Sequence, residues 1–536
     1  MTVKTRRYAV AIVGGGPVGM GLALELGLRG VACALIEPRR ALGRIPKGQN
    51  LTQRTLEHFS RWGVEREIRA ARLMPAGYPI GELTAYGDLM SPYWHAPAGR
   101  ELVRRFYAQD NERLPQYRTE EVLRRRVGTL ACVDFRVGWT ARSIRSGDDG
   151  AEVAIAGDAG IEETLAAEYV VGCDGSHSFV RKQAGIERSH EDYEQPMLLA
   201  VFRSRSLNEA LARFPERSTY RVLRPELKGY WQFFGRVDVP DGWFFHAPVP
   251  SGATLESVDA LALIQQAAGF PCTCEFEHLS LWNMRVAIAD RYRAGRVIVA
   301  GDAAHSHPPY GGFGLNNGVE DAVNLGWKLA ARIEGWGGDA LLDSYGLERQ
   351  PVIRETADDF ISARIQRDAA FLERYSPRRN AAEFEAAWRA READIGSRFQ
   401  QYEPHYEGSP VIPGPGGGRS GALGQHALRA RPGHHLAPLP LAAGGNTFDA
   451  LGRGFTLLAF DADEGDVAAF EDAARGLSIP LAIVRDTLAG GGEAYETRLV
   501  LVRPDQYVAW TGDGARVDAG AVLRRATGRT ADSDKT

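Results

Sequence analysis

The sequence has few cysteines, a small net charge and no long apolar run, and each absence excludes a class of protein. Five cysteines among 536 residues include no Cys-x-x-Cys pair, so we expect neither a disulfide framework nor a redox pair. No apolar segment approaches the ~20 residues that cross a bilayer. A net charge of −4 gives no reason to expect nucleic acid or an anionic membrane as partner. We therefore expect a cytoplasmic protein that binds neither.

The composition is that of a globular chain with more than one core. Hydrophobic residues make up 44% and charged residues 25% of the sequence, which is typical of water-soluble domains. A chain of 536 residues is too long for a single core, so two or three domains are expected.

The first motif is a complete βαβ unit near the start. An apolar strand over 8–13 is followed by the turn Gly-Gly-Gly-Pro-Val-Gly at 14–19, a helix to about residue 30 and a second strand over 32–36. Gly14, Gly16 and Gly19 occupy the G-x-G-x-x-G positions, and Glu37 follows about 20 residues on, where it can bond ribose hydroxyls. The unit predicts a dinucleotide site without deciding between NAD and FAD. The alternative is a Rossmann-like unit that has lost its nucleotide.

The most informative stretch is residues 301–317, which read Gly-Asp-Ala-Ala-His-Ser-His-Pro-Pro-Tyr-Gly-Gly-Phe-Gly-Leu-Asn-Asn. It follows an apolar strand over 297–300 and leads into a helix over 319–329. The glycines allow the main chain to approach a ligand closely, and the free N–H groups of a helix start favour an electron-rich group. The pattern indicates a backbone shaped around something flat. A tight strand-turn-helix connection is the plainer alternative.

A third segment, 169–181, runs from an apolar strand through Asp174-Gly175 into a helix rich in early hydroxyls. An Asp-Gly turn that caps a helix explains these residues locally. It does not explain why they fall between the other two motifs.

Along the chain the motifs follow in the order 14–19, 169–181 and 301–317, over some 300 residues. They resemble those of the class A FAD-dependent aromatic hydroxylases, in the phenol hydroxylase branch. The resemblance implies bound FAD and transient NADH or NADPH. It further implies that one oxygen atom of O2 passes to a phenolic ring through a flavin C4a-hydroperoxide. The cofactor-binding residues that it implies are Gly14, Gly16, Pro17, Val18, Gly19, Glu37, Pro38, Arg39, Gln49, Gln116, Asp174, Gly175, Gly301, Asp302, Pro309, Gly312, Gly314, Leu315 and Asn316.

The proton-handling residue is not identified by any motif. His307 lies in the 301–317 loop as a flavin-side or loop-bracing residue, and Tyr230, Arg221 and His95 are weaker candidates from their places in the expected sheet. A metal is not expected, because the pair His305-x-His307 beside two prolines lacks a ligand set.

Fold class follows from these motifs together with the rest of the chain: an α/β fold with a Rossmann-like FAD-binding domain, an inserted β-rich substrate domain and a C-terminal thioredoxin-like domain. Aromatic runs at 220–223, 229–234 and 242–249, separated by turn residues, predict an antiparallel sheet. The last domain is expected from alternating strands and helices and from Leu-Val-Arg-Pro-Asp at 501–505, which resembles a signature of that branch. Without Cys-x-x-Cys it is expected to be structural or to make a homodimer contact.

The expected boundaries are 1–75, 109–185 and 286–400 for the FAD-binding domain and 76–108 with 186–285 for the substrate domain. A linker at 401–420, the thioredoxin-like domain at 421–525 and a disordered tail at 526–536 complete the chain. Two other functions stay open. A flavin halogenase would need a Trp-x-Trp-x-Ile-Pro stretch, which Gly-Tyr-Trp-Gln at 229–232 does not match. A flavoprotein that binds an aromatic ligand without turnover is the non-enzymatic alternative.

Overall fold

A mostly parallel sheet organises the first part of the chain. The computed structural model describes residues 6–414, 418–514 and 517–529. The strand order of this sheet is β16-β17-β10-β1-β2-β7, with the β8–β9 hairpin attached to β10. Its strands are β1 (Arg6–Val13), β2 (Cys33–Glu37), β7 (Val133–Val137), β8 (Trp139–Gly147), β9 (Gly150–Gly157), β10 (Glu162–Gly172), β16 (Arg293–Ala294) and β17 (Val297–Val299). The parallel pairs place the carboxyl ends of β1, β2, β10 and β17 at one edge, where α/β sheets bind ligands.

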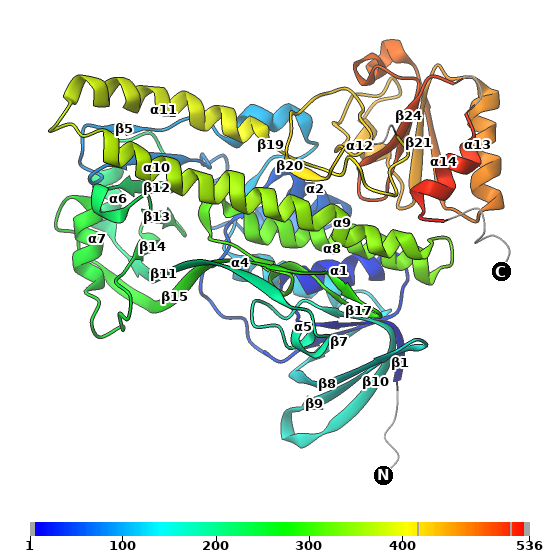
Figure 1. Cartoon of the computed structure of the whole chain (residues 1–536), viewed down its shortest axis with the longest axis horizontal. Coiled ribbons are helices and arrows are strands. Elements are labelled where there is room, and N and C mark those ends of the chain that lie inside the picture. Colours follow the sequence, from blue (N-terminus) through cyan, green and yellow to red (C-terminus); the bar gives the residue numbers. More distant parts are fainter. Residues whose placement is uncertain (1–5, 415–417, 515–516, 530–536) are drawn as a thin grey trace.

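Helices bury the parallel sheet because its strands are apolar on both faces. The helices are α1 (Pro17–Gly27), α2 (Gln53–Arg61), α3 (Glu65–Ala70), α4 (Gln116–Val127), α5 (Phe179–Gln183), α8 (Phe313–Ile333) and α9 (Asp339–Glu355). Helix α1 packs against α4 and α8, and a short two-stranded ribbon, β3 (Asn50–Leu51) with β6 (Glu112–Arg113), lies beside them. Long helices α8 and α9 run side by side through the middle of the molecule (Figure 1).

The second sheet has the order β18-β15-β11-β14-β13-β12-β4-β5. Its strands are β4 (Glu82–Tyr86), β5 (Trp94–His95), β11 (Arg188–Arg203), β12 (Thr219–Leu223), β13 (Gln232–Arg236), β14 (Gly242–Pro248), β15 (Glu275–Ala289) and β18 (His305–Ser306), with helices α6 (Arg205–Leu211) and α7 (Ala260–Ala268). The expectation of an antiparallel sheet needs one correction. Strand β4 pairs parallel to β12, which no hairpin constrains because the two strands are distant in sequence.

Two further helices cover this second sheet. A π-helical segment (Thr356–Ser362) leads from α9 into α10 (Ala363–Arg374), and α11 (Ala381–Gln401) follows. Both α10 and α11 lie along the side of the sheet that carries β5 and β12 (Figure 1). Among the described residues, no helix is long and apolar enough to cross a membrane.

The C-terminal unit has its own sheet, ordered β22-β21-β23-β24. It contains α12 (Thr447–Ala450), β21 (Phe455–Phe460), α13 (Glu464–Gly476), β22 (Leu481–Asp486), β23 (Leu499–Val502), β24 (Val508–Gly512) and α14 (Ala519–Ala526). The segment expected to be a linker, 401–420, holds β19 (Tyr402–His405), which pairs with β20 (Gly421–Leu423); residues 415–417 lie outside the described residues. Of the expected tail, Ala526 ends α14 and Thr527 is buried, whereas 530–536 lie outside the described residues.

The C-terminal unit docks through a fully buried ion-pair cluster. Arg503 makes two bonds to Glu348 of α9, at 2.7 and 2.9 Å, and also pairs with Asp505. Lys328 of α8 donates to the same Glu348 at 2.6 Å, and the Trp327 indole donates to Asp505 at 3.0 Å. Because the side chains of Arg503, Glu348, Asp505 and Lys328 are all 0% exposed, removing one charge leaves others buried without a partner.

We expect Arg503→Met to destabilise the protein by about 3–5 kcal/mol, because Glu348 and Asp505 would keep their buried charges without the guanidinium. Thermal unfolding should then shift down by roughly 5 °C or more. Arg485→Met is the matched control, because the ion pairs of Arg485 with Glu464 and Glu471 are exposed. Equal melting temperatures for the two variants would contradict the docking role of Arg503.

Candidate functional site: two adjoining cavities

The larger cavity, about 850 Å³, lies at the carboxyl edge of the parallel sheet. All but three of the nineteen expected cofactor-binding residues line it, although they come from segments up to 300 residues apart. The lining residues are Gly14, Gly16, Pro17, Val18, Glu37, Pro38, Arg39, Gln49, Gln116, Asp174, Gly175, Asp302, Pro309, Gly312, Gly314 and Leu315. The exceptions are Gly19, Gly301 and Asn316.

The three glycines of the first turn have different structural roles. Gly14 has φ +108°, and a Cβ there would lie 2.3 Å from the carbonyl oxygen of Cys173, so Gly14 lets the turn pack on β10. A Cβ on Gly19 would lie 1.9 Å from the Gly14 oxygen. Gly16 differs, because a Cβ there would meet no atom within 4 Å and would face the cavity. The backbone at Gly16, at the start of α1, is therefore the part that a bound phosphate can approach.

Acidic and amide side chains surround the rest of the cavity. Glu37 Oε2 accepts from the backbone N–H of Gly15 at 2.9 Å, and Oε1 accepts from the backbone N–H and the Nε of Arg39 at 2.8 and 2.9 Å, so Oε2 retains a lone pair for a hydroxyl. Asp302 exposes its carboxylate at the opposite side. The side-chain oxygen of Gln49 is buried and has no hydrogen-bond partner among the described residues. An unsatisfied buried acceptor in a cavity wall fits a ligand that donates to it.

Asp174 both caps a helix and lines the larger cavity. Its carboxylate accepts from the hydroxyl of Ser178 and from the backbone N–H of Val180 at 3.0 Å, so it caps α5. It also lines the cavity together with Gly175. Gln116 likewise accepts from the Gly48 N–H at 3.3 Å and faces the cavity.

The loop over 301–317 is held by residues that sequence reasoning missed. Asp321 of α8 accepts from the backbone N–H of Gly301 at 3.0 Å, from His305 at 2.6 Å and from Arg349 at 2.7 Å. Although burial raises the pKa of the Asp321 carboxyl, His305 and Arg349 lower it below its ordinary value. The Asp321 carboxylate, kept ionised by these partners, therefore holds Gly301 at the start of the loop through its backbone N–H.

Asn316 is not among the residues that line the larger cavity, and its side chain bonds the backbone of the segment over 50–52. Its side-chain oxygen accepts from the Thr52 N–H at 2.9 Å and its amide donates to the Asn50 oxygen at 2.8 Å. Gly311 and Gly312 adopt φ values of +84° and +71°, which glycine tolerates best. These two glycines turn the loop between the two cavities.

The four candidate catalytic residues are not brought to one place. His307 and Arg221 line the larger cavity, whereas Tyr230 and His95 line neither cavity described here. His95 packs on Trp388 with ring centroids 4.9 Å apart. The guanidinium of Arg221 is buried and already paired with Asp368 at 2.8 Å. His307 donates from Nδ1 to the Pro308 oxygen at 3.0 Å, and its Nε2 is buried with no partner among the described residues.

Aromatic side chains of the second sheet form the wall opposite the loop. Trp231 stacks on Tyr310 with centroids 4.0 Å apart, and Phe233 stacks on His246 at 4.8 Å. Trp231, Phe233 and His246 all line the larger cavity. His246 was missed because a histidine inside an aromatic strand carries no signal of its own.

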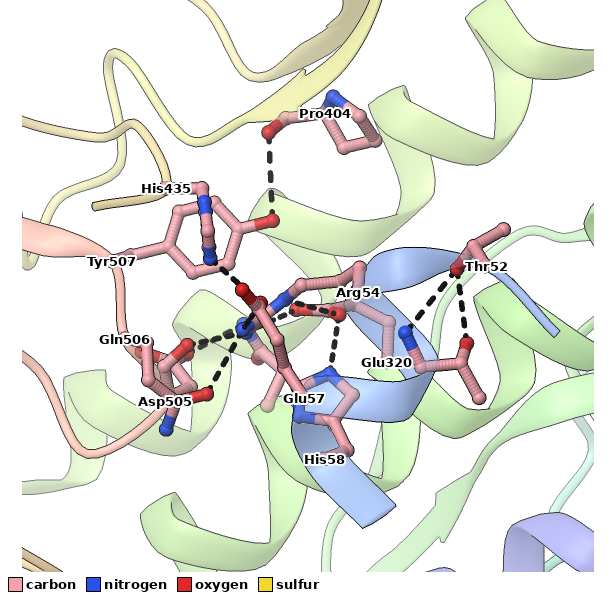
Figure 2. Close-up of polar contacts among 12 residues, drawn as sticks. Thr52, Arg54, Glu57, His58, Glu320, Pro404, His435, Asp505, Gln506 and Tyr507 are labelled. Atoms are coloured by element: carbon pink, nitrogen blue, oxygen red, sulfur yellow. Dashed lines mark hydrogen bonds and ion pairs between the residues drawn. The ribbon is translucent and has the colours of Figure 1, made fainter. Parts of the chain in front are cut away.

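A second cavity, about 600 Å³, adjoins the first and shares Arg100, Arg221, Gly311, Arg364 and Phe399 with it. Helices α10 and α11 form much of its wall, and the C-terminal unit contributes His435 and Tyr507. Arg54 of α2 links α8 to the C-terminal unit: it pairs with Glu320 and Glu57 at 3.1 Å each and donates to Gln506 at 2.9 Å (Figure 2). The C-terminal unit thus completes this cavity.

The larger cavity suits a flavin dinucleotide on the chain's own features. A glycine turn open at Gly16, hydroxyl acceptors at Glu37 and Asp302, and an unsatisfied acceptor at Gln49 match the phosphates, ribose, ribityl and ring N–H of such a ligand. A metal is not needed by this donor set.

Comparison with known proteins agrees with this geometry. The model of the FAD binding domain family matches residues 7–359, and the aromatic-ring hydroxylase C-terminal family matches 429–533. The 4-methyl-5-nitrocatechol 5-monooxygenase of a Burkholderia species is 31% identical over 96% of both chains. The tetracenomycin A2 monooxygenase-dioxygenase of Streptomyces glaucescens is 29% identical over 98% of this chain and 97% of its own. The crystal structure of aklavinone-11 hydroxylase with FAD and aklavinone superposes with a TM-score of 0.80 at 27% identity, covering 97% and 99% of the chains.

We expect Gly16→Val to fold but to lose FAD, because its side chain meets no protein atom and projects into the cavity. Affinity should fall at least about tenfold, the equivalent of one lost phosphate contact. The ratio of flavin absorbance to protein absorbance measures it. Gly476→Val is the control, since that glycine also has open space but lies in the C-terminal unit. Full occupancy in Gly16→Val would refute the assignment.

We expect stability to fall as the pH is lowered below about 6.5. Burial lowers the pKa of His95 and His246 to about 3 and that of His307 to about 4. The unfolded chain therefore binds protons at these imidazoles before the folded chain does, so each contributes stability above pH 6.5 that is lost on acidification. Melting temperatures between pH 7 and 5 measure the slope, and His246→Phe should flatten it. An unchanged slope in that variant would contradict the assignment.

Proposed function

We propose a reaction and a substrate class for this chain, which belongs to the FAD-dependent aromatic-ring monooxygenases. The enzyme uses NADH or NADPH and O2 to hydroxylate a phenolic ring that is part of a larger, flat ring system. The observation that carries this proposal is the pair of adjoining cavities that meet at Gly311. One is shaped for the cofactor, and the other holds the substrate with one edge at the loop.

The size and lining of the second cavity support a substrate of several rings. A volume of about 600 Å³ lies within the range of pockets that enclose drug-sized ligands, and a single phenol would leave most of it empty. Eight aromatic side chains line it, among them Phe313, Phe360, Tyr402 and Tyr507. Two of the relatives above are named for tetracenomycin A2 and aklavinone, and one for a nitrocatechol.

The chain's own residues position and ionise the substrate. Bound FAD, once reduced, supplies the activation of oxygen. Arg100 donates to the Gly311 oxygen at 3.3 Å and lies where the two cavities meet. A guanidinium there favours the ionised form of a ring hydroxyl, which makes the ring more electron-rich. The buried Nε2 of His307 offers a hydrogen-bond acceptor on the cofactor side of the larger cavity.

The C-terminal unit has the element order of a thioredoxin-like fold, and we assign it that fold as part of the proposal. Strand β21, helix α13 and strand β22 form a parallel βαβ unit, followed by antiparallel β23 and β24 and by α14. The unit contains no cysteine, since all five cysteines of the sequence lie before residue 275. Its role is to complete the substrate cavity rather than to carry out thiol chemistry.

The test is NAD(P)H oxidation by FAD-loaded protein with single-ring phenols and with hydroxylated tricyclic or tetracyclic aromatics, followed by mass spectrometry. We expect the multi-ring compounds to stimulate oxidation at least about tenfold more than phenols and to gain one oxygen atom. Preferential turnover of single-ring phenols would contradict the substrate class. Binding without any oxygenated product would favour the ligand-binding alternative.

A further inference from the structure

We propose that the substrate carries a carboxylate, which Arg367 of α10 binds in the second cavity. This inference rests on the proposed function and specifies its substrate. The cavity wall includes nine arginines against four carboxylates, whereas the whole chain has a net charge of −4. A wall whose charge is opposite in sign to that of the chain selects anions.

Most of these arginines are neutralised within the protein. Arg364 pairs with Glu82, Arg391 pairs with Asp368, and Arg398 pairs with Asp394 at 3.2 Å. Acidic partners from beyond the cavity wall also serve Arg54 and Arg349. Because the guanidiniums of these arginines already bind carboxylates of the protein, they do not need a ligand to balance their charge.

Arg367 is different. Within the described part of the chain it makes no hydrogen bond or ion pair, although it is partly buried in the cavity wall. Positions 364, 367, 371 and 374 share one face of α10, and all four line the cavity. Its charged neighbours include Arg364 and Arg398 as well as Asp368 and Asp394, but each of these four already belongs to a pair. The guanidinium of Arg367 is therefore available to an anion that enters the cavity.

A carboxylate on a flat ring system meets both features of this wall. The guanidinium can hold the two oxygens of a carboxylate with two parallel bonds. The neighbouring Phe371 and Tyr375 offer apolar surface to the ring that bears it. Arg100, at the loop end of the same cavity, remains free of carboxylate partners among the described residues and faces the ring hydroxyl instead.

The test uses 4,5-dihydroxyanthraquinone-2-carboxylic acid and its methyl ester, which share one ring system and differ in charge. Their dissociation constants for the FAD-loaded enzyme are measured from the change in flavin absorbance. We expect the acid to bind at least about tenfold more tightly, the worth of one charge-assisted bond. Arg367→Gln should weaken the acid about tenfold and leave the ester unchanged.

Arg389→Gln is the matched control, since Arg389 is exposed on α11 outside the cavity wall and should change neither constant. Equal binding of acid and ester, no binding of either, or a preference for the acid that survives in Arg367→Gln would each overturn the inference. Product analysis separates it from the proposed function. Oxygenation of the ester without preference for the acid leaves hydroxylation standing, whereas tight binding of the acid without oxygenation of either probe leaves only the anion site.

Discussion

The structure depends on the burial of charged side chains along one helix, α8. Asp321 fixes the start of the flavin loop through the Gly301 N–H at 3.0 Å. Glu320, one residue further back, pairs with Arg54 of α2 at 3.1 Å, and Lys328 bonds the Glu348 to which Arg503 is also bound. Buried charges are tolerated only with their partners in place. One helix thus ties the cofactor loop, the α2 segment and the C-terminal unit to a single geometry.

The second cavity is a consequence of this arrangement. Arg54 reaches Gln506 only while the C-terminal unit is docked, and Tyr507 of the same loop lies in the cavity wall. The unit therefore helps to shape the second cavity, whereas no described residue of the unit lines the larger one. Its Arg-Pro-Asp segment, which carries no redox chemistry, is explained by docking, because both charges of that segment are used against α8 and α9.

Many residues of the candidate cofactor cavity could be named from the sequence because each turn that lines it is a local structure, although the turns lie far apart in the chain. A glycine turn between a strand and a helix forms wherever that sequence occurs, and the residues around Gly16 and Asp302 lie in such turns. The substrate site was not predictable to the same degree. Arg367 sits on a charged helix that looks like any solvated surface, and only the packing of α10 and α11 over the second sheet turns that face inward. Asn316 was named from its motif position, and its side chain bonds the backbone of Asn50 and Gly312, two residues that line the larger cavity.

This contrast has a physical origin that bears on specificity. The candidate cofactor cavity is lined by turn backbone at Gly14 and Gly16 and by side chains such as Glu37, and the turn itself tolerates little variation. The wall of the second cavity is formed by side chains on α10, on α11 and in the C-terminal unit, many of which can change without disturbing the turn at Gly16. Arg367, like Arg100, has no acidic partner among the described residues, whereas most of the other arginines of the wall do, so its guanidinium is free to bind a ligand carboxylate.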